Sequence, residues 1–299
     1  AVNAGAIGVS TSRLLAHRDS DGNLAPHVYT AKEELMELAL GLRDAGKGVF
    51  QIASAFSNQN LKSVLPEIGD MTPDEVMRQE LALLSEISRV SGRPITFSLT
   101  AQNNAPEMGR RVLEAIAEAN KEPGVKIIPQ IFPRPIGLLF GLDLSLNPFL
   151  FHPSYKAIEH MPRPQRVAEM KKPEVRARIL SEVTDPTHPN PIQRMLVVRS
   201  LDAYPATNEP DYEPDPNNSL KSIAAREGKT VYEAAYDALL QRDGKAILYL
   251  PMINYGGNNL DSVYDMFASK DAVLGLGDAG AHYGFISDGT YPSFLLTYW

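Results

Sequence analysis

The sequence contains no cysteine among its 299 residues. Disulfide bonds and thiolate zinc sites are therefore excluded, so any metal must be held by histidine, carboxylate or other oxygen donors. No apolar run approaches the roughly 18 residues that a membrane helix needs, and residues 1–13 lack the charged start and long apolar centre of a signal peptide. We expect a cytoplasmic protein with no membrane partner.

An excess of basic residues is also missing. The sequence has 29 Lys and Arg residues and 36 Asp and Glu residues, which gives a formal net charge of −7. No cluster of basic residues lies among aromatic ones, so nucleic acid is not expected as a partner. With 43% hydrophobic and 22% charged residues, the chain reads as one large or two ordinary globular domains. It has no initiator methionine and stops at Trp299 inside an apolar run, which predicts an internal fragment. Its oligomeric state is open.

Short apolar segments alternate with longer amphipathic ones, a pattern typical of a parallel sheet flanked by helices. Two helix starts carry capping signals: Thr30 with Glu33 before Gly46, and Thr72 with Pro73 before Gly92. The alternation fits either an open doubly wound sheet or a (β/α) barrel. The predicted strands are 6–10, 49–54, 95–99, 125–131, 195–199, 246–251 and 272–277; the predicted helices are 30–46, 72–92, 106–120, 164–183, 219–228, 230–242 and 259–269.

Residues 132–218 interrupt this alternation and hold most of the prolines. So much proline predicts ordered loops that cover one face of the fold, and not helix or strand. In a barrel, an insertion after a strand builds the substrate pocket. The alternative is a solvated linker, against which stands the apolar content of "IGLLFGLDLSLNPFLFHPSY".

The stretch "VLGLGDAG" places Gly275, Gly277 and Gly280 at the spacing of a dinucleotide-binding loop. That motif needs a helix directly after the glycines and a second strand ending in an acid, and neither pattern follows here. The alternative is that Asp278 ends a strand and points into a pocket, where barrel enzymes keep their chemistry. An aspartate before Ala-Gly is also common in turns and helix caps.

The segment 272–299, "AVLGLGDAGAHYGFISDGTYPSFLLTYW", resembles the last-strand region of the amidohydrolase superfamily, in the branch of D-aminoacylases and N-acyl-D-amino-acid deacylases. The segments "AGAIGVSTSRLLAHRDSDGNLAPH" and "SLKSIAAREGKTVYEAAYDALL" resemble the same branch. The resemblance implies an α/β fold, a (β/α)8 TIM barrel of the metal-dependent hydrolase type whose first strands and C-terminal part are missing. Residues 1–299 would form this partial barrel, with the proline-rich insertion at about 132–218.

The resemblance also implies the chemistry. One divalent metal, zinc in most of the family, activates water to attack an amide bond of a small molecule. By position Asp278 is the metal ligand and general base, with most other ligands expected upstream of residue 1. The implied substrate-binding candidates are His282, Asn254, Tyr255, Arg134 and Gln130, with Arg13 a further carboxylate clamp. For His282 and both arginines a surface role is the alternative, and Asn254 can equally cap a turn.

The sequence departs from this family where two strands normally supply histidines. Ser98, Gln102 and Gln130 stand at those strand ends, and all are weak ligands for zinc. Two hypotheses follow: a one-metal amide hydrolase, or a barrel that has lost the metal site and acts as a binding or regulatory protein. Surface positions are expected for the remaining histidines, which are His17, His27, His152, His160 and His188. Asp288 is expected to fix its own loop or to cap a helix.

Overall fold

A computed structural model shows two compact units. It describes all residues except 20, 57, 59–68, 185–187, 276, 278–282 and 287–288. The first unit comprises Ala1–Pro133 and Leu260–Leu276, and the second comprises Arg134–Asn259 and Gly277–Trp299. Within the described ranges, no helix is long and apolar enough to cross a membrane.

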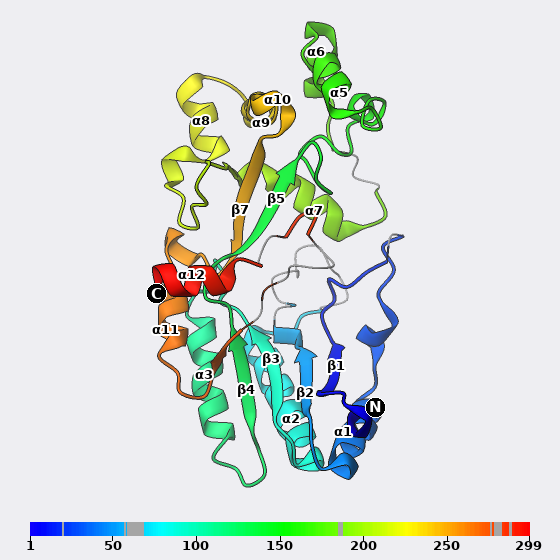
Figure 1. Cartoon of the computed structure of the whole chain (residues 1–299), viewed down its shortest axis with the longest axis vertical. Coiled ribbons are helices and arrows are strands. Elements are labelled where there is room, and N and C mark those ends of the chain that lie inside the picture. Colours follow the sequence, from blue (N-terminus) through cyan, green and yellow to red (C-terminus); the bar gives the residue numbers. More distant parts are fainter. Residues whose placement is uncertain are drawn as a thin grey trace. The chain divides into compact units, whose positions relative to one another are not determined.

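The first unit is built on a parallel sheet of five strands in the order β1-β2-β3-β4-β8 (Figure 1). Every neighbouring pair of strands is parallel, so the predicted alternation of strands and helices is confirmed. Closure of this sheet into a barrel stays a prediction. Its strands are β1 (Gly8–Ser12), β2 (Val49–Ala53), β3 (Ile95–Leu99), β4 (Ile127–Ile131) and β8 (Val273–Leu274).

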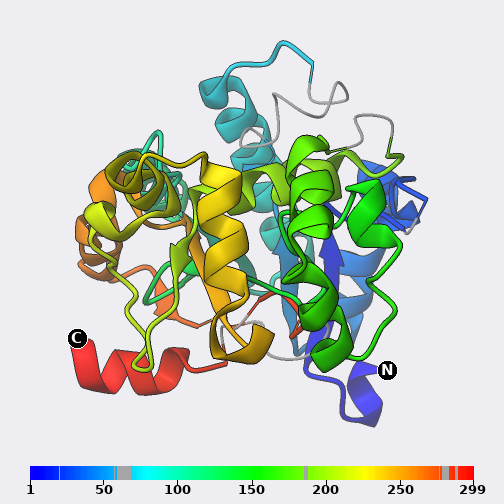
Figure 2. The same ribbon diagram turned by 90° about the horizontal axis from the view of Figure 1, so that it is seen from above.

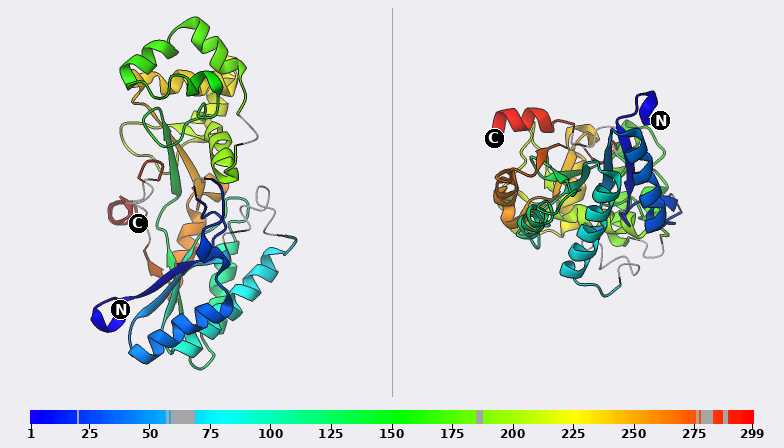
Figure 3. Two further views of the ribbon diagram at one scale, coloured as in Figure 1. Left: turned by 90° about the vertical axis from the view of Figure 1, so that its right-hand side faces the viewer. Right: turned by 90° about the horizontal axis from the view of Figure 1, so that it is seen from below.

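Helices cover one face of this sheet, as Figure 3 shows for α1 and α2. The first-unit helices are α1 (Lys32–Ala45), α2 (Pro73–Ser91), α3 (Met108–Ala119) and α11 (Asp261–Phe267). The predicted cap of α2 is confirmed: Thr72 and Glu75 form a capping box, and Gly92 ends the helix in the left-handed conformation. The predicted cap of α1 is wrong. The Thr30 hydroxyl donates to the His27 carbonyl oxygen at 2.6 Å, and α1 starts after Ala31 without a side-chain cap.

The second unit is built on an antiparallel sheet in the order β5-β7-β6. Its strands are β5 (Ile136–Gly141), β6 (Tyr204–Pro205) and β7 (Ile247–Ile253). Its helices are α4 (Pro153–Lys156), α5 (Arg163–Met170), α6 (Pro173–Ser181), α7 (Pro191–Arg199), α8 (Leu220–Glu227), α9 (Val231–Leu239), α10 (Gln241–Gly244) and α12 (Tyr291–Tyr298).

The core of the second unit lies between one face of the antiparallel sheet and helices α5 to α9, several of which are visible from above in Figure 2. The sheet contributes Leu138 and Phe140 from β5 and Leu248 and Leu250 from β7, all buried. The helices contribute apolar side chains such as Met170, which is completely buried. Residues 132–218 therefore contain helices and strands that supply much of a core, and the prediction that they form neither is wrong.

Two strand predictions fail in this unit. Residues 195–199 form the second half of α7, because Pro191 takes the first turn and the Asn190 side chain accepts from the backbone N–H groups of Ile192 and Gln193. The strand predicted at 246–251 exists as β7, but it pairs antiparallel with β5 and β6 and not with the parallel sheet. The helix predicted at 164–183 is divided into α5 and α6 before Pro173.

Candidate functional site

The face of the parallel sheet opposite its helices carries several polar side chains, together with Ile128. The register places Ser10, Gln51 and Thr96 in one row and Ser98 beside Gln130 in another. The Gln130 Nε2 donates to Thr96 Oγ1 at 3.1 Å, and the Ser10 hydroxyl donates to Gln51. On β2, β3 and β4 their neighbours along the strand are buried and face the helices. Gln130, predicted as a substrate contact, therefore lies on a half-buried, hydrogen-bonding surface.

An ion pair ties together the ends of β1 and β2. Arg13 follows β1, and its Nε lies 2.9 Å from Oε1 of Glu80 on α2, whose side chain is 3% exposed. The other Glu80 oxygen accepts from the backbone N–H of Ala55 at 3.1 Å, just past β2. Asn58 accepts from the Leu15 N–H at 2.9 Å and donates to the Arg13 carbonyl at 3.1 Å. Arg13 thus has a carboxylate partner inside the protein.

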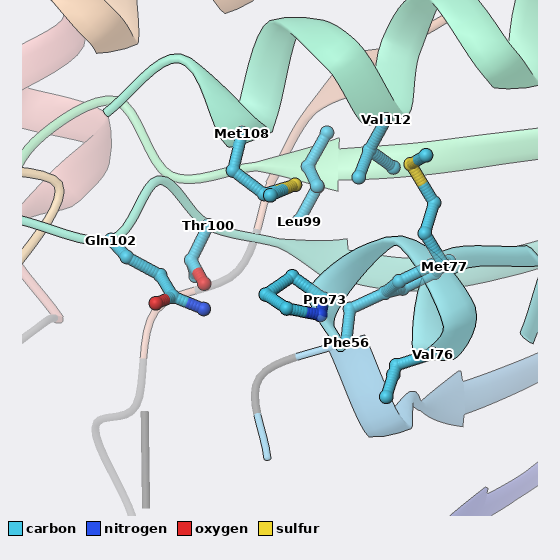
Figure 4. A pocket seen from close by; sticks show the side chains of 9 residues that line it. All are labelled: Phe56, Pro73, Val76, Met77, Leu99, Thr100, Gln102, Met108 and Val112. Carbon is cyan, nitrogen blue, oxygen red and sulfur yellow. The ribbon is translucent and has the colours of Figure 1, made fainter. Parts of the chain in front are cut away.

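A small cavity opens beyond the end of β3, between Leu99, Phe56 and helices α2 and α3. Figure 4 shows Thr100 and Gln102 as its polar members, on the segment after β3, with Pro73 of α2 facing them. Its volume is about 20 Å³, which holds about one water molecule. The cavity is too small for a substrate and places Gln102 beside apolar side chains.

The segment that carries Asp278 leaves the sheet beside Gln130. In β8, Val273 pairs with Gln130, and the Gly275 N–H donates to the Ile131 carbonyl at 3.1 Å. Asp278 comes three residues after Gly275 in the chain. Asp278, His282 and Asp288 all lie outside the described residues, so their roles stay predictions. In the part of the chain that the structure describes, no three His, Asp or Glu side chains are grouped so that they could hold a metal.

Arg134, the predicted carboxylate clamp, is 1% exposed in the second unit. Its guanidinium carbon lies 4.3 Å from the centre of the Tyr212 ring, a cation–π arrangement. The Nη2 donates to Thr290 Oγ1 at 3.2 Å, and the Tyr212 hydroxyl lies 2.9 Å from the same oxygen. The buried Arg134 thus lies under the half-buried Tyr212 ring and bonds the exposed Thr290, and the three form one cluster.

Asn254 and Tyr255 follow β7 and are both buried. Asn254 has a left-handed φ of 63°, which asparagine tolerates better than most residues, and its Nδ2 lies 3.5 Å from the Arg134 carbonyl oxygen, at the limit of a hydrogen bond. The Tyr255 hydroxyl donates to the Pro214 carbonyl at 3.0 Å. Burial raises the pKa of Tyr255, so this phenol stays a neutral donor. The structure brings Asn254 to Arg134, whereas Gln130 belongs to the first unit.

A pocket that sequence reasoning missed lies on the second face of the antiparallel sheet. We call it the tyrosine pocket after Tyr204, Tyr212 and Tyr249, and its volume is about 220 Å³. Its other lining residues include Asp211 and Pro214 from the proline-rich loop. The three tyrosines are far apart in the sequence, and the alternating acids of "EPDYEPDPNN" were the only signal that pointed to this loop.

Of the histidines predicted at the surface, His27 and His160 are exposed, whereas His152 departs from the prediction. His152 is completely buried, which corrects the surface prediction, and its Nδ1 donates to the Ile179 carbonyl at 2.8 Å. Its ring contacts Phe149 and Tyr232. His17 and His27 form a pair with 3.3 Å between Nδ1 and Nε2. None of these contacts places a histidine beside Gln130.

No known protein family and no curated protein matches the chain. Three solved D-aminoacylase structures are similar to it at 17% identity, with TM-scores of 0.38, 0.39 and 0.38. They come from a study of the binuclear metal centre of D-aminoacylase, from a mutant with copper chloride, and from a study that defines D-aminoacylase as a novel subset of amidohydrolases. Each match covers 92% of this chain and 39% of the D-aminoacylase, so the chain spans about two fifths of their length.

Proposed function

We propose that the chain is part of a hydrolase of small-molecule amides, of the N-acyl-D-amino-acid deacylase type, with Asp278 as its reactive carboxylate. The observation that carries the proposal is the all-parallel sheet, whose strands share one carboxyl edge and whose last strand, β8, is followed by Asp278. Barrel enzymes keep their catalytic residues at this edge. In this proposal the sheet is a segment of a (β/α)8 barrel.

The polar side chains on the sheet face opposite the helices support this proposal. Barrel interiors are usually filled by Val, Ile and Leu; beside Ile128, this sheet face also presents Ser10, Gln51, Thr96, Ser98 and Gln130. Carboxamide and hydroxyl groups both donate and accept hydrogen bonds, as an amide substrate requires. We assign Gln130 and His282 to substrate contact.

The reaction divides into two proton transfers. Asp278 takes a proton from water as the water oxygen bonds to the scissile carbonyl carbon, and the same proton passes to the amine nitrogen as the C–N bond breaks. Arg134, Asn254 and Tyr255 are each buried and bonded to the chain or to a ring, so in this proposal they support the structure of the second unit.

Zinc, implied by the family resemblance, does not fit the described residues. They contain no group of three ligands, and Ser98 and Gln130 offer an alcohol and a carboxamide in place of imidazoles. The one ligand predicted by residue, Asp278, lies outside the described residues. No catalytic step is therefore assigned to a metal, and metal content is a separate measurement.

The test compares Asp278→Ala with Asp265→Ala, which removes an exposed carboxylate from α11. With an N-acyl-D-amino acid as substrate and the intact protein, Asp278→Ala should abolish turnover while circular dichroism stays unchanged, and Asp265→Ala should hydrolyse normally. Turnover near the unsubstituted level in Asp278→Ala would end the assignment.

A second candidate is a binding protein with the same fold and no catalysis, favoured by Ser98 and Gln130 at the strand ends. Hydrolysis of an N-acyl-D-amino acid by the intact protein separates the two candidates, and elemental analysis after purification without chelator records the metal content beside it. No amide hydrolysis by the folded protein, with less than about half an equivalent of divalent metal, identifies the binding protein.

A further inference from the structure

The tyrosine pocket lies over the face of the antiparallel sheet that points away from the core. Leu139 of β5 pairs with Tyr249 of β7, which pairs with Tyr204 of β6, so the three side chains form one row across the sheet. Their neighbours Leu138 and Leu250 point to the opposite face and into the core. The loop at 206–218 forms the other wall of the pocket. The second face of this sheet is therefore partly covered by the loop.

The aromatic walls of the pocket are fixed in place. Tyr212 is held by Thr290 at 2.9 Å and by Arg134 at 4.3 Å, and its ring meets Tyr249 edge-on with 6.0 Å between centres. The Tyr249 ring lies over Gly137, where a Cβ atom would sit 2.1 Å from Cε2. The glycine thus provides the space that the ring fills. Because these side chains are already fixed, the pocket loses little conformational entropy when a ligand binds.

The loop surrounds the pocket with negative charge. Glu209, Asp211, Glu213 and Asp215 occupy alternate positions in it. Asp211 lines the pocket, and no lysine or arginine is among the described residues that do so. Burial raises the pKa of Tyr204, and the nearby Asp215 and Asp202 raise it further. The Arg134 guanidinium is buried behind Tyr212 and is not part of the lining.

We propose that the tyrosine pocket binds a small organic cation with an apolar surface, of the quaternary ammonium type. Aromatic faces attract such cations through the negative charge of their π systems, and Asp211 supplies a full charge. At about 220 Å³ the pocket is smaller than the ~300–1,000 Å³ of sites for drug-sized ligands. Proline and leucine side chains contact the methyl groups. This site is independent of Asp278 and of amide hydrolysis.

The test uses three probes in calorimetric or ligand-observed NMR titrations of the intact protein, the first two of nearly equal shape. Choline carries the cation, 3,3-dimethylbutan-1-ol replaces its nitrogen by carbon, and phosphocholine adds a phosphate. We expect choline to bind at least about threefold more tightly than the neutral alcohol, as an exposed cation–π contact allows. Phosphocholine should not bind measurably, because the acids repel it; this arm separates a free cation from a lipid headgroup. Equal binding of choline and the alcohol overturns the proposal, as does no binding of choline.

A matched pair of variants tests the charge. Asp211→Asn keeps the side-chain oxygen that accepts from the Glu213 N–H at 3.0 Å and removes the charge that lines the pocket. Glu209→Gln removes an equal charge from the same loop outside the lining. Asp211→Asn should weaken choline binding about threefold or more, and Glu209→Gln by less than about twofold. Choline affinity unchanged in Asp211→Asn overturns the proposal.

A second pair tests the aromatic wall. Tyr212→Phe keeps the ring and loses the contact with Thr290, whereas Tyr212→Leu loses the ring. Choline binding should survive the first and be lost in the second, with near-ultraviolet circular dichroism and urea midpoints showing that both variants are folded. Retained binding in a folded Tyr212→Leu variant contradicts the cation–π contact. If the leucine variant unfolds, Tyr204→Leu takes its place, with the same two outcomes.

Discussion

Glu80→Gln is expected to weaken the carboxyl edge of the parallel sheet. The Glu80 carboxylate accepts from Arg13 Nε at 2.9 Å and from the Ala55 N–H at 3.1 Å, one donor on each oxygen. A carboxamide of the same shape has one oxygen and turns its NH2 group toward the other donor. A hydrogen bond to a charged group contributes about 1.5–3 kcal/mol. The Arg13 side chain is 30% exposed, so water screens part of its attraction to the Glu80 carboxylate.

We therefore expect Glu80→Gln to lower the free energy of unfolding by about 2–3 kcal/mol. The control is Glu86→Gln on the same helix, whose pair with Lys32 is exposed and should contribute less than about 0.5 kcal/mol. Urea unfolding measures the global free energy of unfolding, and native-state hydrogen exchange at the Ala55 amide measures the free energy of local opening there. A loss below about 0.5 kcal/mol, with Ala55 exchanging as slowly as before, would refute the reasoning.

Two further substitutions probe the second unit. Tyr236→Phe removes the hydroxyl that donates to the Met170 carbonyl oxygen at 2.7 Å. Urea unfolding should show that the free energy of unfolding falls by about 1–2 kcal/mol, whereas the control Tyr232→Phe should change it little. Burial raises the pKa of Tyr236 from 10.0 to about 12, so the folded protein favours the neutral phenol. The stability that this preference adds to the folded state is fully present below pH 10 and is lost as the pH rises through 12. Unfolding free energies across that range should fall more steeply for the unsubstituted protein than for Tyr236→Phe, and parallel curves would contradict the assignment. Gly137→Ala puts a methyl group 2.1 Å from Tyr249 Cε2, so overpacking should cost about 1–3 kcal/mol of unfolding free energy. Gly41→Ala, inside α1 with nothing within 4 Å, should instead stabilise by about 0.5–1 kcal/mol, and equal effects of the two would show that the ring is not fixed.

The sequence predicts the elements of the parallel sheet well because its signals there are local. Alternation, capping residues such as Thr72 and terminal glycines such as Gly92 act within a few residues of the ends they define. The direction in which β7 pairs is not local information, since a continuous apolar run fits a strand in either kind of sheet. Residues 195–199, "MLVVR", carry β-branched side chains typical of strands, but Asn190 and Pro191 start a helix that continues through them.

In the candidate site, too, positions along a strand could be predicted from the sequence, whereas contacts between distant segments could not. Gln130 was predicted as a substrate contact from its place near a strand end; the register places it beside Ser98, and the contact with substrate stays a prediction. Arg134 was predicted from the same kind of position, and nothing in the sequence showed that Tyr212 would cover it. The tyrosine pocket depends on the pairing of β5, β6 and β7, so no reading of one segment at a time could find it. Asp278 and His282 stay predictions.

The order of the two units along the chain has a kinetic consequence. β8 completes the parallel sheet by pairing with β4, although the whole segment Arg134–Asn259 of the second unit lies between them in the sequence. Closing a flexible loop of roughly 140 residues is entropically costly, and that cost falls when the loop is already compact. The second unit has its own core and can collapse without β8. We therefore expect β8 to be the last strand to join its sheet, which makes the segment leading to Asp278 the slowest part of the fold to mature.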